Sequence, residues 1–404
     1  MAELAHARLS ASGAHRWMAC PGSVRLESTL PGESSRYAEE GTVAHEVASR
    51  CLQTGENASD HLGSRYYPSD EAEGAFFSVP VDSTCPQDGP GYEVDDEMVE
   101  SVQLYLDYVR QQPGTLAIEQ RVDYSPWVPE GFGTADAIIL HDGTAAVVDL
   151  KYGKGVGVDA EDNPQIMLYA LGALNEFGFA FDIDEFKLVI IQPRRDHISE
   201  WTISRKDLEA FGEWARKCAD RALADDAPLT PSTKACQFCK ARGSCKALTE
   251  HIYNMACEGF EAIGGPVDLR NQMLLSPQER SALLNDLDIL TGYADAVRAE
   301  SIGMLMRGQP IPGFKLVEGK TNRKWADEEA AGKALARKLG TKDAYTRKTI
   351  PITQAEKLLG KGNSLIAKHT IKPPGKPTLA PESSPKPALE FDITDGFEAI
   401  DEAA

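Results

Sequence analysis

The sequence of 404 residues lacks any apolar run that approaches the ~20 residues needed to cross a bilayer. This absence excludes a membrane-spanning helix, and we expect no membrane partner. Residues 1–6 have neither the basic flank nor the apolar stretch of a signal peptide. We therefore expect a cytoplasmic protein, in which the eight cysteines are reduced thiols or metal ligands rather than disulfides.

Three motifs of well-known enzyme classes are also missing. There is no Gly-x-x-x-x-Gly-Lys-Ser/Thr loop, which excludes a P-loop motor in this chain. There is no nucleophile elbow and no His-Glu-x-x-His zinc motif. The glycine-rich stretch 153–157 follows an expected strand without opening a helix, and we interpret it as a basic loop.

The chain also lacks an overall positive charge. Its net charge of −20 argues against a protein that simply coats nucleic acid. The charge is uneven, because residues 307–376 hold about 16 Lys and Arg against about 6 Asp and Glu. This stretch is either a local basic surface or a solvated helical face.

Hydrophobic periodicity predicts a sheet with flanking helices, in an α/β or α+β fold. The expected strands are 116–122, 133–140, 145–151, 186–192 and 198–203, and the expected helices are 7–28, 42–52, 95–112, 164–177, 205–223 and 277–306. Thr42 is expected to cap the second helix. The expected domains are 1–265 with an irregular insertion at 53–93, a helical basic region at 266–372 with a short β segment at 313–317, and a disordered Pro-rich linker with an acidic tail at 373–404.

A turn at residues 141–144 joins two of the expected strands and brings two acids together. If this turn closes a hairpin, Leu140 pairs with Ala145 and Asp136 then lies opposite Asp149. Opposed residues lie roughly 4.5–5.5 Å apart on one face of a sheet, where like charges are destabilising. Two carboxylates in this position need a cation between them.

Lys151 lies two residues beyond Asp149, so its side chain leaves the strand on the same face. Phosphodiester hydrolysis needs a divalent cation, and Mg²⁺ takes carboxylate and carbonyl oxygens as ligands. Asp136, Asp149 and the carbonyl of Leu150 supply such oxygens, and Lys151 is suited to hold water or neutralise charge on phosphorus. The alternative is a pair of edge-strand acids that form an ion pair with Lys151.

Three further side chains are candidates for the same site. His45 on the second helix is a candidate metal ligand, although a single histidine on a helix is more often structural. Gln165 and Tyr169 are four residues apart, so they share one face of the helix that follows the acids. Their amide and phenol groups are suited to bind a DNA backbone or the lysine; ordinary helix-surface polarity is the alternative.

A basic loop carries three cysteines, Cys236, Cys239 and Cys245. Tetrahedral zinc would take a fourth ligand nearby, from Cys257 or His251. A four-iron cluster also needs four thiolates, and the fourth is often remote in sequence. Cys20, which precedes Pro-Gly, is the candidate for that position. The spacing leaves zinc, an iron–sulfur cluster and free thiols open.

In chain order, the sequence carries Cys20-Pro-Gly-Ser, Gly41-Thr-Val-Ala-His45, Gly133-Thr-Ala-Asp136, Asp149-Leu-Lys151, Gln165-x₃-Tyr169 and Cys236-x₂-Cys239-x₅-Cys245. This series resembles the RecB-type branch of the PD-(D/E)XK nuclease superfamily. More narrowly, it is similar to the iron–sulfur members, which include the AddB nuclease domain and the CRISPR-adaptation nucleases, and to a phage- and prophage-borne group. The resemblance covers residues 8–250 and implies a restriction-endonuclease-like core, a mixed sheet flanked by helices.

The resemblance implies a role for each matching residue. His45, Asp136 and Asp149 would bind Mg²⁺ or Mn²⁺, Lys151 would be the catalytic lysine, and Gln165 and Tyr169 would contact DNA. A [4Fe–4S] cluster would be bound by Cys20, Cys236, Cys239 and Cys245. Glu119, on the preceding strand, is a possible additional acid. The second acid of the Asp-x-Lys motif is Asp rather than Glu, which the family tolerates.

The expected function is that of a Mg²⁺- or Mn²⁺-dependent deoxyribonuclease, an exonuclease that acts on DNA ends in phage recombination or replication. The alternative is a DNA-binding or assembly protein that keeps the nuclease fold without cutting. In the basic region, the aromatic residues are either stacking platforms or core residues: Phe314, Trp325 and Tyr345. The acidic tail either docks on a single-strand DNA-binding or replication protein or only aids solubility; its apolar residues are Phe391, Ile393, Phe397 and Ile400.

Overall fold

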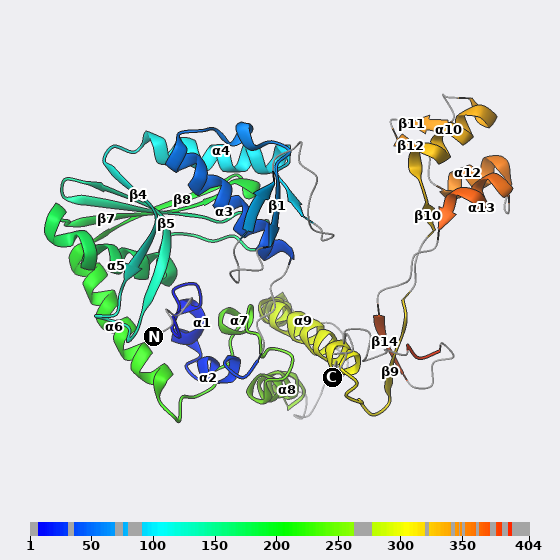
Figure 1. Cartoon of the computed structure of the whole chain (residues 1–404). Coiled ribbons are helices and arrows are strands. Elements are labelled where there is room, and N and C mark those ends of the chain that lie inside the picture. The colour runs from blue at the N-terminus through cyan, green and yellow to red at the C-terminus, as the bar shows by residue number, and fades with distance from the viewer. Residues whose placement is uncertain are drawn as a thin grey trace, which may run out of the picture. The chain divides into compact units, whose positions relative to one another are not determined.

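The computed structural model describes residues 7–30, 36–68, 76–79, 91–261, 277–319, 323–340, 344–346, 348–349, 352–360, 363–371, 377–381 and 387–389. The chain divides into two units, Met1–Leu290 and Thr291–Ala404, and each is described by itself (Figure 1). The expected domain boundary near residue 265 and the expected acidic tail from residue 390 lie outside the described residues.

A five-stranded mixed sheet forms the centre of the first unit. Its order is β4-β5-β6-β7-β8. The strands are β4 (Thr115–Asp123), β5 (Phe132–His141), β6 (Thr144–Leu150), β7 (Glu185–Gln192) and β8 (His197–Ser204). Strands β6 and β7 are parallel and the other neighbours are antiparallel. All five strands that the sequence predicts are therefore present.

The hairpin between β5 and β6 has the predicted register. Leu140 pairs with Ala145 and His141 pairs with Thr144, which leaves a two-residue turn of Asp142 and Gly143. Gly143 has φ +73°, in the left-handed region that glycine adopts without steric cost. The Asp-Gly pair thus fixes the register that brings the two acids together.

Helices cover both faces of the sheet, as the predicted mixed α/β fold requires (Figure 1). The two covering helices on one face are α3 (Arg36–Thr54) and α4 (Asp96–Gln111), and those on the other are α5 (Pro164–Phe181) and α6 (Arg205–Leu223), with α1 (Ala14–Ala19). Each face has its own apolar core, because strand residues alternate between them: Ile138 and Val147 pack with α5, whereas Ile139 and Val148 pack with α4. Residues on either face of the sheet are therefore fixed by packing.

Side-chain caps explain where the covering helices begin. Asp95 accepts a hydrogen bond from the Met98 amide at 2.9 Å, at the start of α4. Asn163 accepts one from the Gln165 amide at 3.0 Å, and Pro164 occupies the first turn of α5. Ser204 caps α6. These caps fix the residue at which each of the three helices begins, and so fix which side chains of the helix face the sheet.

Two regions of the first unit differ from the prediction. Helix α3 begins at Arg36, and Thr42 lies inside it with its hydroxyl bonded to the Ala38 carbonyl, so Thr42 is not the cap. The segment predicted as irregular, 53–93, contains a three-stranded sheet of order β2-β1-β3. Its elements are the short 3₁₀ helix η1 (Ala58–His61) and strands β1 (Arg65–Pro68), β2 (Phe76–Val79) and β3 (Tyr92–Glu93); residues 69–75 and 80–90 are outside the described chain.

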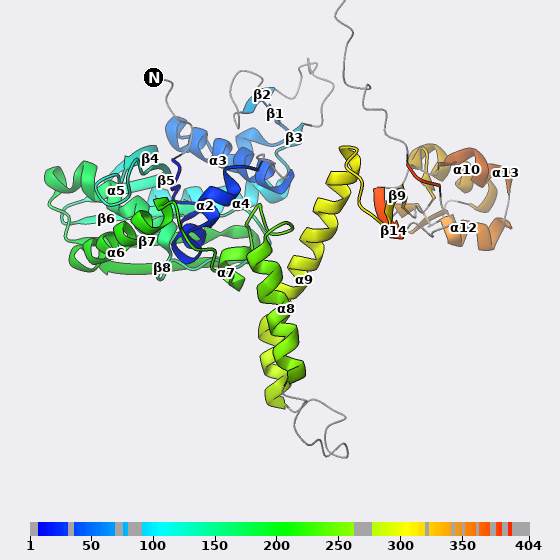
Figure 2. The same ribbon diagram turned by 90° about the horizontal axis from the view of Figure 1, so that it is seen from below.

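The N-terminal helices pack against the segment that follows α6 (Figure 2). The elements are α2 (Ser23–Glu27), α7 (Thr233–Cys236) and α8 (Lys246–Glu261). The Gly22 amide donates to the Pro228 carbonyl at 2.8 Å, and a Cβ on Gly22 would lie 2.7 Å from the Ala227 carbonyl oxygen. Only glycine allows this approach, and it brings Cys20 to the cysteine-rich loop.

Helix α9 (Pro277–Met306) begins in the first unit and continues into the second. The other elements of the second unit are β9 (Phe314–Glu318), β10 (Lys324–Trp325), α10 (Glu328–Leu339), β11 (Tyr345–Thr346), β12 (Lys348–Thr349), α12 (Ile352–Leu359), α13 (Ser364–His369), β13 (Thr370–Ile371) and β14 (Pro377–Pro381). A small core of Leu335, Ala344, Ala355 and Ile366 holds the helices. Strand β14 pairs with β9, so this part of the Pro-rich linker lies in a sheet and is not disordered as predicted.

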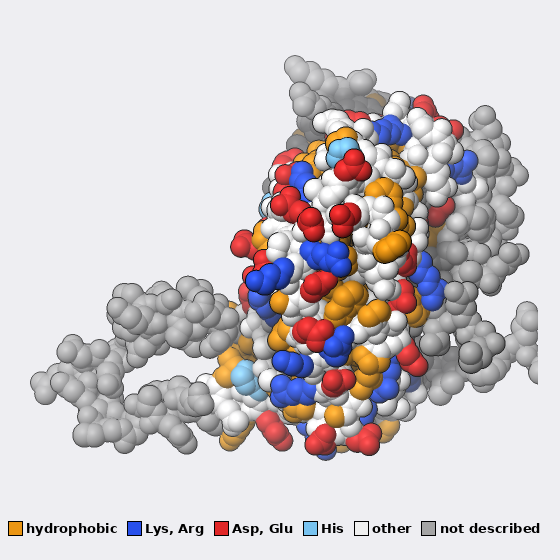
Figure 3. All heavy atoms as spheres, turned by 90° about the vertical axis from the view of Figure 1, so that its left-hand side faces the viewer, with side chains coloured by type: hydrophobic (Ala, Val, Ile, Leu, Met, Phe, Trp, Pro, Cys, Tyr) orange, Lys and Arg blue, Asp and Glu red, His pale blue; other side chains and the backbone are white. Residues whose placement is uncertain are grey.

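Charged residues of both signs mix on the face of the molecule shown in Figure 3. This is the face of the α5 side in Figure 1. Phe179 of α5 and Trp214 of α6 are exposed. In the described residues, no helix is both long enough and apolar enough to cross a membrane.

Candidate functional site

The hairpin brings Asp136 to the end of β6. Its Oδ2 accepts a hydrogen bond from the Leu150 amide at 2.7 Å. The paired residues of β5 and β6 end at Ala137 and Val148, one step before the two acids. Leu150 thus contributes its amide to the site. That its carbonyl binds a metal stays a prediction. The carboxylate of Asp136 therefore replaces a backbone acceptor and is held firmly.

Asp149 and Lys151 form an ion pair next to this carboxylate. Asp149 Oδ2 lies 2.7 Å from Lys151 Nζ, and Asp149 is only 3% exposed. Burial raises the pKa of Asp149, and Asp136 adds to this, while Lys151 opposes it. Burial lowers the pKa of Lys151, but the two carboxylates outweigh it, so the net pKa is raised and Lys151 is a cation at neutral pH.

His45 from α3 and Glu119 from β4 complete an acidic cluster around Asp136. His45 Nδ1 lies 3.2 Å from Asp136 Oδ1. One ligand atom each from His45, Glu119 and Asp136 lies within 4.8 Å of the others. This is the arrangement expected of residues that share one metal ion, and it includes the acid that sequence reasoning gave only as an additional candidate.

The charges in this cluster shift one another. Burial lowers the pKa of His45, but attraction to Asp136 outweighs it and raises the pKa to about 9. Protein atoms crowd the carboxyl group of Glu119 although the residue is exposed, and with Asp136 they raise its pKa to about 7. Burial raises the pKa of Asp136, and His45 more than reverses this. The cluster is short of positive charge, which a cation would supply.

Glu119 reaches the cluster through an irregularity in β4. Its neighbours pair with β5 as Ile118 with Ala137 and Gln120 with Ala135, while Glu119 itself has φ +46° and interrupts the ladder. A non-glycine residue in this conformation at a candidate site points to a functional constraint. The same register sets Glu119 beside Asp136, whereas sequence reasoning named it only as a possible additional acid on the preceding strand.

Gln165 and Tyr169 extend the site onto α5. Gln165 Nε2 lies 3.3 Å from both Asp149 Oδ1 and the Tyr169 hydroxyl. Tyr169 is 7% exposed, and burial raises its pKa. A Cβ on Gly133 would lie 2.7 Å from Cε1 of Tyr169, which explains the glycine in this motif. The predicted pair is therefore part of the site, and Gln165 joins it to Asp149 by a hydrogen bond.

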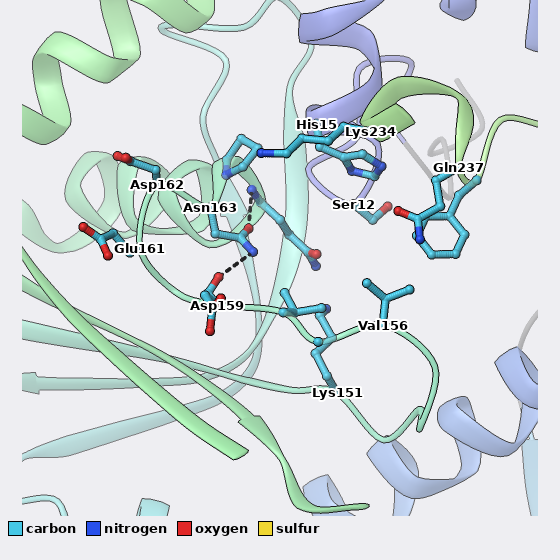
Figure 4. A pocket seen from close by; sticks show the side chains of 15 residues that line it. Ser12, His15, Lys151, Val156, Asp159, Glu161, Asp162, Asn163, Lys234 and Gln237 are labelled. Carbon is cyan, nitrogen blue, oxygen red and sulfur yellow. Dashed lines mark hydrogen bonds between the residues drawn. The ribbon is translucent and has the colours of Figure 1, made fainter. Parts of the chain in front are cut away.

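A cleft of about 480 Å³ opens beside Lys151 and Gln165. Its walls come from the N-terminal segment, the loop between β6 and α5, and the cysteine-rich loop. Figure 4 shows His15 and Lys234 on one side and the acids Asp159, Glu161 and Asp162 on the other. Sequence reasoning missed this cleft, because its walls are remote from one another along the chain.

The four predicted cysteines line a single small cavity. The cavity is bounded by Cys20, Cys236, Cys239 and Cys245, together with apolar groups that include Leu26, Leu229 and Leu248. The Thr230 amide donates to Cys20 Sγ at 3.2 Å. All four are free thiols in the structure. The cavity therefore brings the remote Cys20 to the other three cysteines.

The thiols in this cavity are poorly solvated. Burial raises the pKa of Cys20 and of Cys236, and raises that of Cys239 to about 12. In a tetrahedral zinc site the sulfur atoms lie about 3.8 Å apart, because each Zn–S bond is about 2.3 Å. Among the described residues, the group of three possible ligands within 4.8 Å of one another is His45, Glu119 and Asp136, so no three cysteine sulfurs meet that spacing.

The other predicted positions are two on α8 and three aromatic residues of the second unit. His251 is half-buried on α8, and the side chain of Cys257 lies outside the described part of the chain. In the second unit Phe314 is 48% exposed, Trp325 packs against the small core, and the side chain of Tyr345 is outside the described residues. Trp325 thus follows the core interpretation.

The sheet, its covering helices and this acidic cluster define a mixed α/β protein with a candidate metal centre. Residues 6–387 match the family described as "Protein of unknown function (DUF2800)", and the chain belongs to this family. It is also similar to a solved structure titled "Crystal structure of SSO0001", at 15% identity and a TM-score of 0.25, over 61% of this chain and 90% of that chain.

Proposed function

We propose that this protein is a metal-dependent nuclease that hydrolyses phosphodiester bonds in DNA, as the RecB-like resemblance implies. The observation that carries the proposal is the convergence of His45, Asp136, Asp149 and Lys151 at one point, from three separate elements. A purely structural ion pair would need only Asp149 and Lys151. Here two further carboxylates, Glu119 and Asp136, meet the imidazole of His45, and together they form the donor set of a metal site rather than of a single ion pair.

The donor set fits a divalent cation. His45, Glu119 and Asp136 already place one ligand atom each within 4.8 Å of the others, and Asp149 lies next to them. Carboxylate oxygens suit Mg²⁺ and Mn²⁺. Bound there, the cation would polarise the phosphoryl oxygen and lower the pKa of a water molecule. Asp149, as the least exposed acid, would fix the orientation of that water.

Lys151 supplies positive charge where the phosphate would lie. Its ammonium group is held by Asp149 and is 27% exposed, on the side that opens to the cleft. Because its pKa is raised, it acts as a fixed cation that stabilises the negative charge of the transition state rather than as a base. Gln165 orients Asp149 from the other side.

We further propose that the four cysteines bind a [4Fe–4S] cluster rather than a single zinc ion. Their common cavity supports a shared four-thiolate site, and the family resemblance favours the cluster over zinc. Anaerobic purification followed by iron, sulfide and zinc analysis tests it. About four irons per chain with absorbance near ~400 nm supports the cluster, and one zinc per chain contradicts it.

The nuclease proposal is tested with purified protein, Mg²⁺ or Mn²⁺, and matched linear and covalently closed circular DNA. An exonuclease digests the linear form alone, whereas an endonuclease also opens the circle. Lys151→Ala should lower the rate by at least about 100-fold if Lys151 acts in the transition state. Equal digestion by wild type and Lys151→Ala would rule out this site, and no digestion with binding retained would favour a DNA-binding protein.

A further inference from the structure

The cysteine-rich loop carries an exposed aromatic residue into the cleft beside the proposed site. Phe238 lies between Cys236 and Cys239, lines the cleft and is 59% exposed. Its ring meets that of His15 edge to face, with the centroids 6.4 Å apart. An exposed phenylalanine in a cleft that also holds Lys151 leaves one ring face available to a flat partner.

The position of Phe238 is fixed by contacts from the N-terminal helices. Arg16 donates from Nη1 to the Phe238 carbonyl at 3.1 Å and from Nε to Glu27 at 2.8 Å. Glu27 also accepts from the Lys240 amide at 2.8 Å. These two charged side chains bind the backbone on both sides of Cys239. The ring is therefore presented by a braced loop and not by a free one.

The cleft has walls of opposite charge. His15 and Lys234 lie on one side with Lys151 at the edge, and Asp159, Glu161 and Asp162 lie opposite (Figure 4). A volume of about 480 Å³ falls within the ~300–1,000 Å³ typical of small-ligand pockets, which is room for a nucleotide. Lys234 and Lys151 attract one phosphate backbone, whereas His15, whose pKa is lowered by burial, is neutral; the acidic wall repels a second backbone.

We propose that Phe238 is a specificity-determining residue that stacks on an unpaired base, so that the cleft feeds single-stranded DNA to the proposed site. Aromatic side chains stack on any base whose face is free, but bases inside a duplex already stack on their neighbours. The proposal rests on the nuclease function inferred above. It adds the form of the substrate and gives the cysteine-rich loop a role in binding it.

The first test compares a single-stranded oligonucleotide with a blunt duplex of the same sequence, in the presence of Mg²⁺. Phe238→Ala should lower kcat/KM for the single strand by about 5- to 150-fold, the equivalent of one stacked base at ~1–3 kcal/mol, mainly through KM. Phe238→Tyr should keep most of the activity. Phe179→Ala, which removes an exposed phenylalanine at the far end of α5, is the matched control.

Binding without hydrolysis separates this proposal from the nuclease function. With no divalent metal, 2-aminopurine in the single strand should lose fluorescence on binding wild type, and Phe238→Ala should abolish that loss. Digestion by wild type with no difference between Phe238→Ala and Phe179→Ala would overturn the stacking role alone. Quenching by wild type with no digestion under any metal would keep the stacking role and overturn the nuclease. Absence of both quenching and digestion would overturn both.

The acidic wall allows an independent test. Asp162 has φ +51°, a conformation that asparagine also tolerates, so Asp162→Asn removes the charge without straining the loop. Combined with Glu161→Gln, it should raise cleavage of the duplex relative to the single strand by a few-fold. Iron content and thermal melting confirm that each variant is folded. An unchanged ratio in a folded variant would contradict the charge argument.

Discussion

The carboxylate site and the cysteine cavity belong to the same unit but are assembled in different ways. Asp136 and the Leu150 amide that binds it are 14 residues apart, within one hairpin. Cys20 and the Thr230 amide that binds its sulfur are 210 residues apart. The first site is therefore set by a local ladder of hydrogen bonds, and the second by contacts between the two ends of the fold.

Because of this difference, the two sites should depend on a bound ligand to different extents. The acids lie on strands whose neighbours fill two apolar cores, so the backbone beneath them stays in place without a ligand. The cysteine cavity is surrounded by a few leucines, and its loop is held by the hydrogen bonds of Arg16 and Glu27. A bound cluster would close a loop of more than two hundred residues, which is where a cross-link contributes most in theory. Losing the cluster should therefore open the cleft wall and leave the sheet intact.

The largest effect should come from neutralising the second acid. Asp149→Asn should lower the rate of DNA cleavage by at least about 100-fold, because it removes a charge that the reaction uses. Burial and Asp136 raise the pKa of Asp149. At a pH above the pKa of Asp149 in the unfolded chain, the charged carboxylate therefore lowers the free energy of unfolding. The amide removes that penalty. Melting of the purified variant should therefore be unchanged or raised.

A fall in melting temperature by several degrees would show that the Asp149–Lys151 ion pair stabilises the fold. The loss of activity would then be a folding effect, and the two sites would not differ as argued. Tyr37→Ala, which removes an exposed side chain (83% exposed), serves as the control for the cleavage rate and for the melting temperature.

The second largest effect should come from the remote cysteine. Cys20→Ser should lower iron from about four per chain to near zero and lower single-strand cleavage by about 10- to 100-fold. Far-UV circular dichroism should stay nearly unchanged, because the sheet has its own cores. Cys218→Ser, a half-buried cysteine outside the cavity, should have neither effect. Retention of iron by Cys20→Ser would exclude Cys20 as a ligand.

A smaller effect is expected at the contact between the hairpin and α5. Gly133→Ala places a Cβ 2.7 Å from the Tyr169 ring, which must shift and carry Gln165 with it. We expect a loss of about 1–3 kcal/mol in the free energy of unfolding, and an approximately tenfold lower rate of cleavage. Gly153→Ala, where nothing lies within 4 Å, is the matched control. Equal stability of the two variants would show that Tyr169 moves freely.

The sheet and the first site could be predicted from sequence because their determinants are local. The turn at Asp142 and Gly143 fixes the β5–β6 register, and alternation along the strands fixes which side chains share a face. Glu119 was harder to place, because its role depends on an irregular backbone conformation. A propensity pattern does not reveal such a conformation before the neighbouring strand is aligned.

The features that were missed or misplaced depend on tertiary contacts. The cleft walls at His15, Asp159 and Lys234 come together through packing that no short sequence window contains. The small sheet of β1, β2 and β3 lies in a stretch rich in residues that favour loops, yet Tyr66 is fully buried there, so packing overrides propensity. The pairing of β14 with β9 overrides a Pro-rich composition in the same way.

The smallest effect should come from the brace between the N-terminal helices and the cysteine-rich loop. Glu27→Ala removes the acceptor of both the Arg16 guanidinium and the Lys240 amide. Each lost hydrogen bond at a half-buried site costs about 0.5–1.5 kcal/mol, so unfolding should become easier by about 1–2 kcal/mol. Single-strand cleavage should fall a few-fold, because the loop that carries Phe238 is held less firmly. Iron content should be kept, since the cysteines are untouched.

The matched control for this brace is Glu213→Ala on α6, where the carboxylate is 57% exposed and pairs with Arg216 within the same helix. An exposed pair of this kind contributes about 0.2–1 kcal/mol and touches neither site. If Glu27→Ala and Glu213→Ala have equal effects on cleavage, the brace does not position the loop. If Glu27→Ala also loses iron, the brace and the cluster form one cooperative element, and the cysteine cavity depends on these polar contacts as strongly as the carboxylate site depends on its ladder.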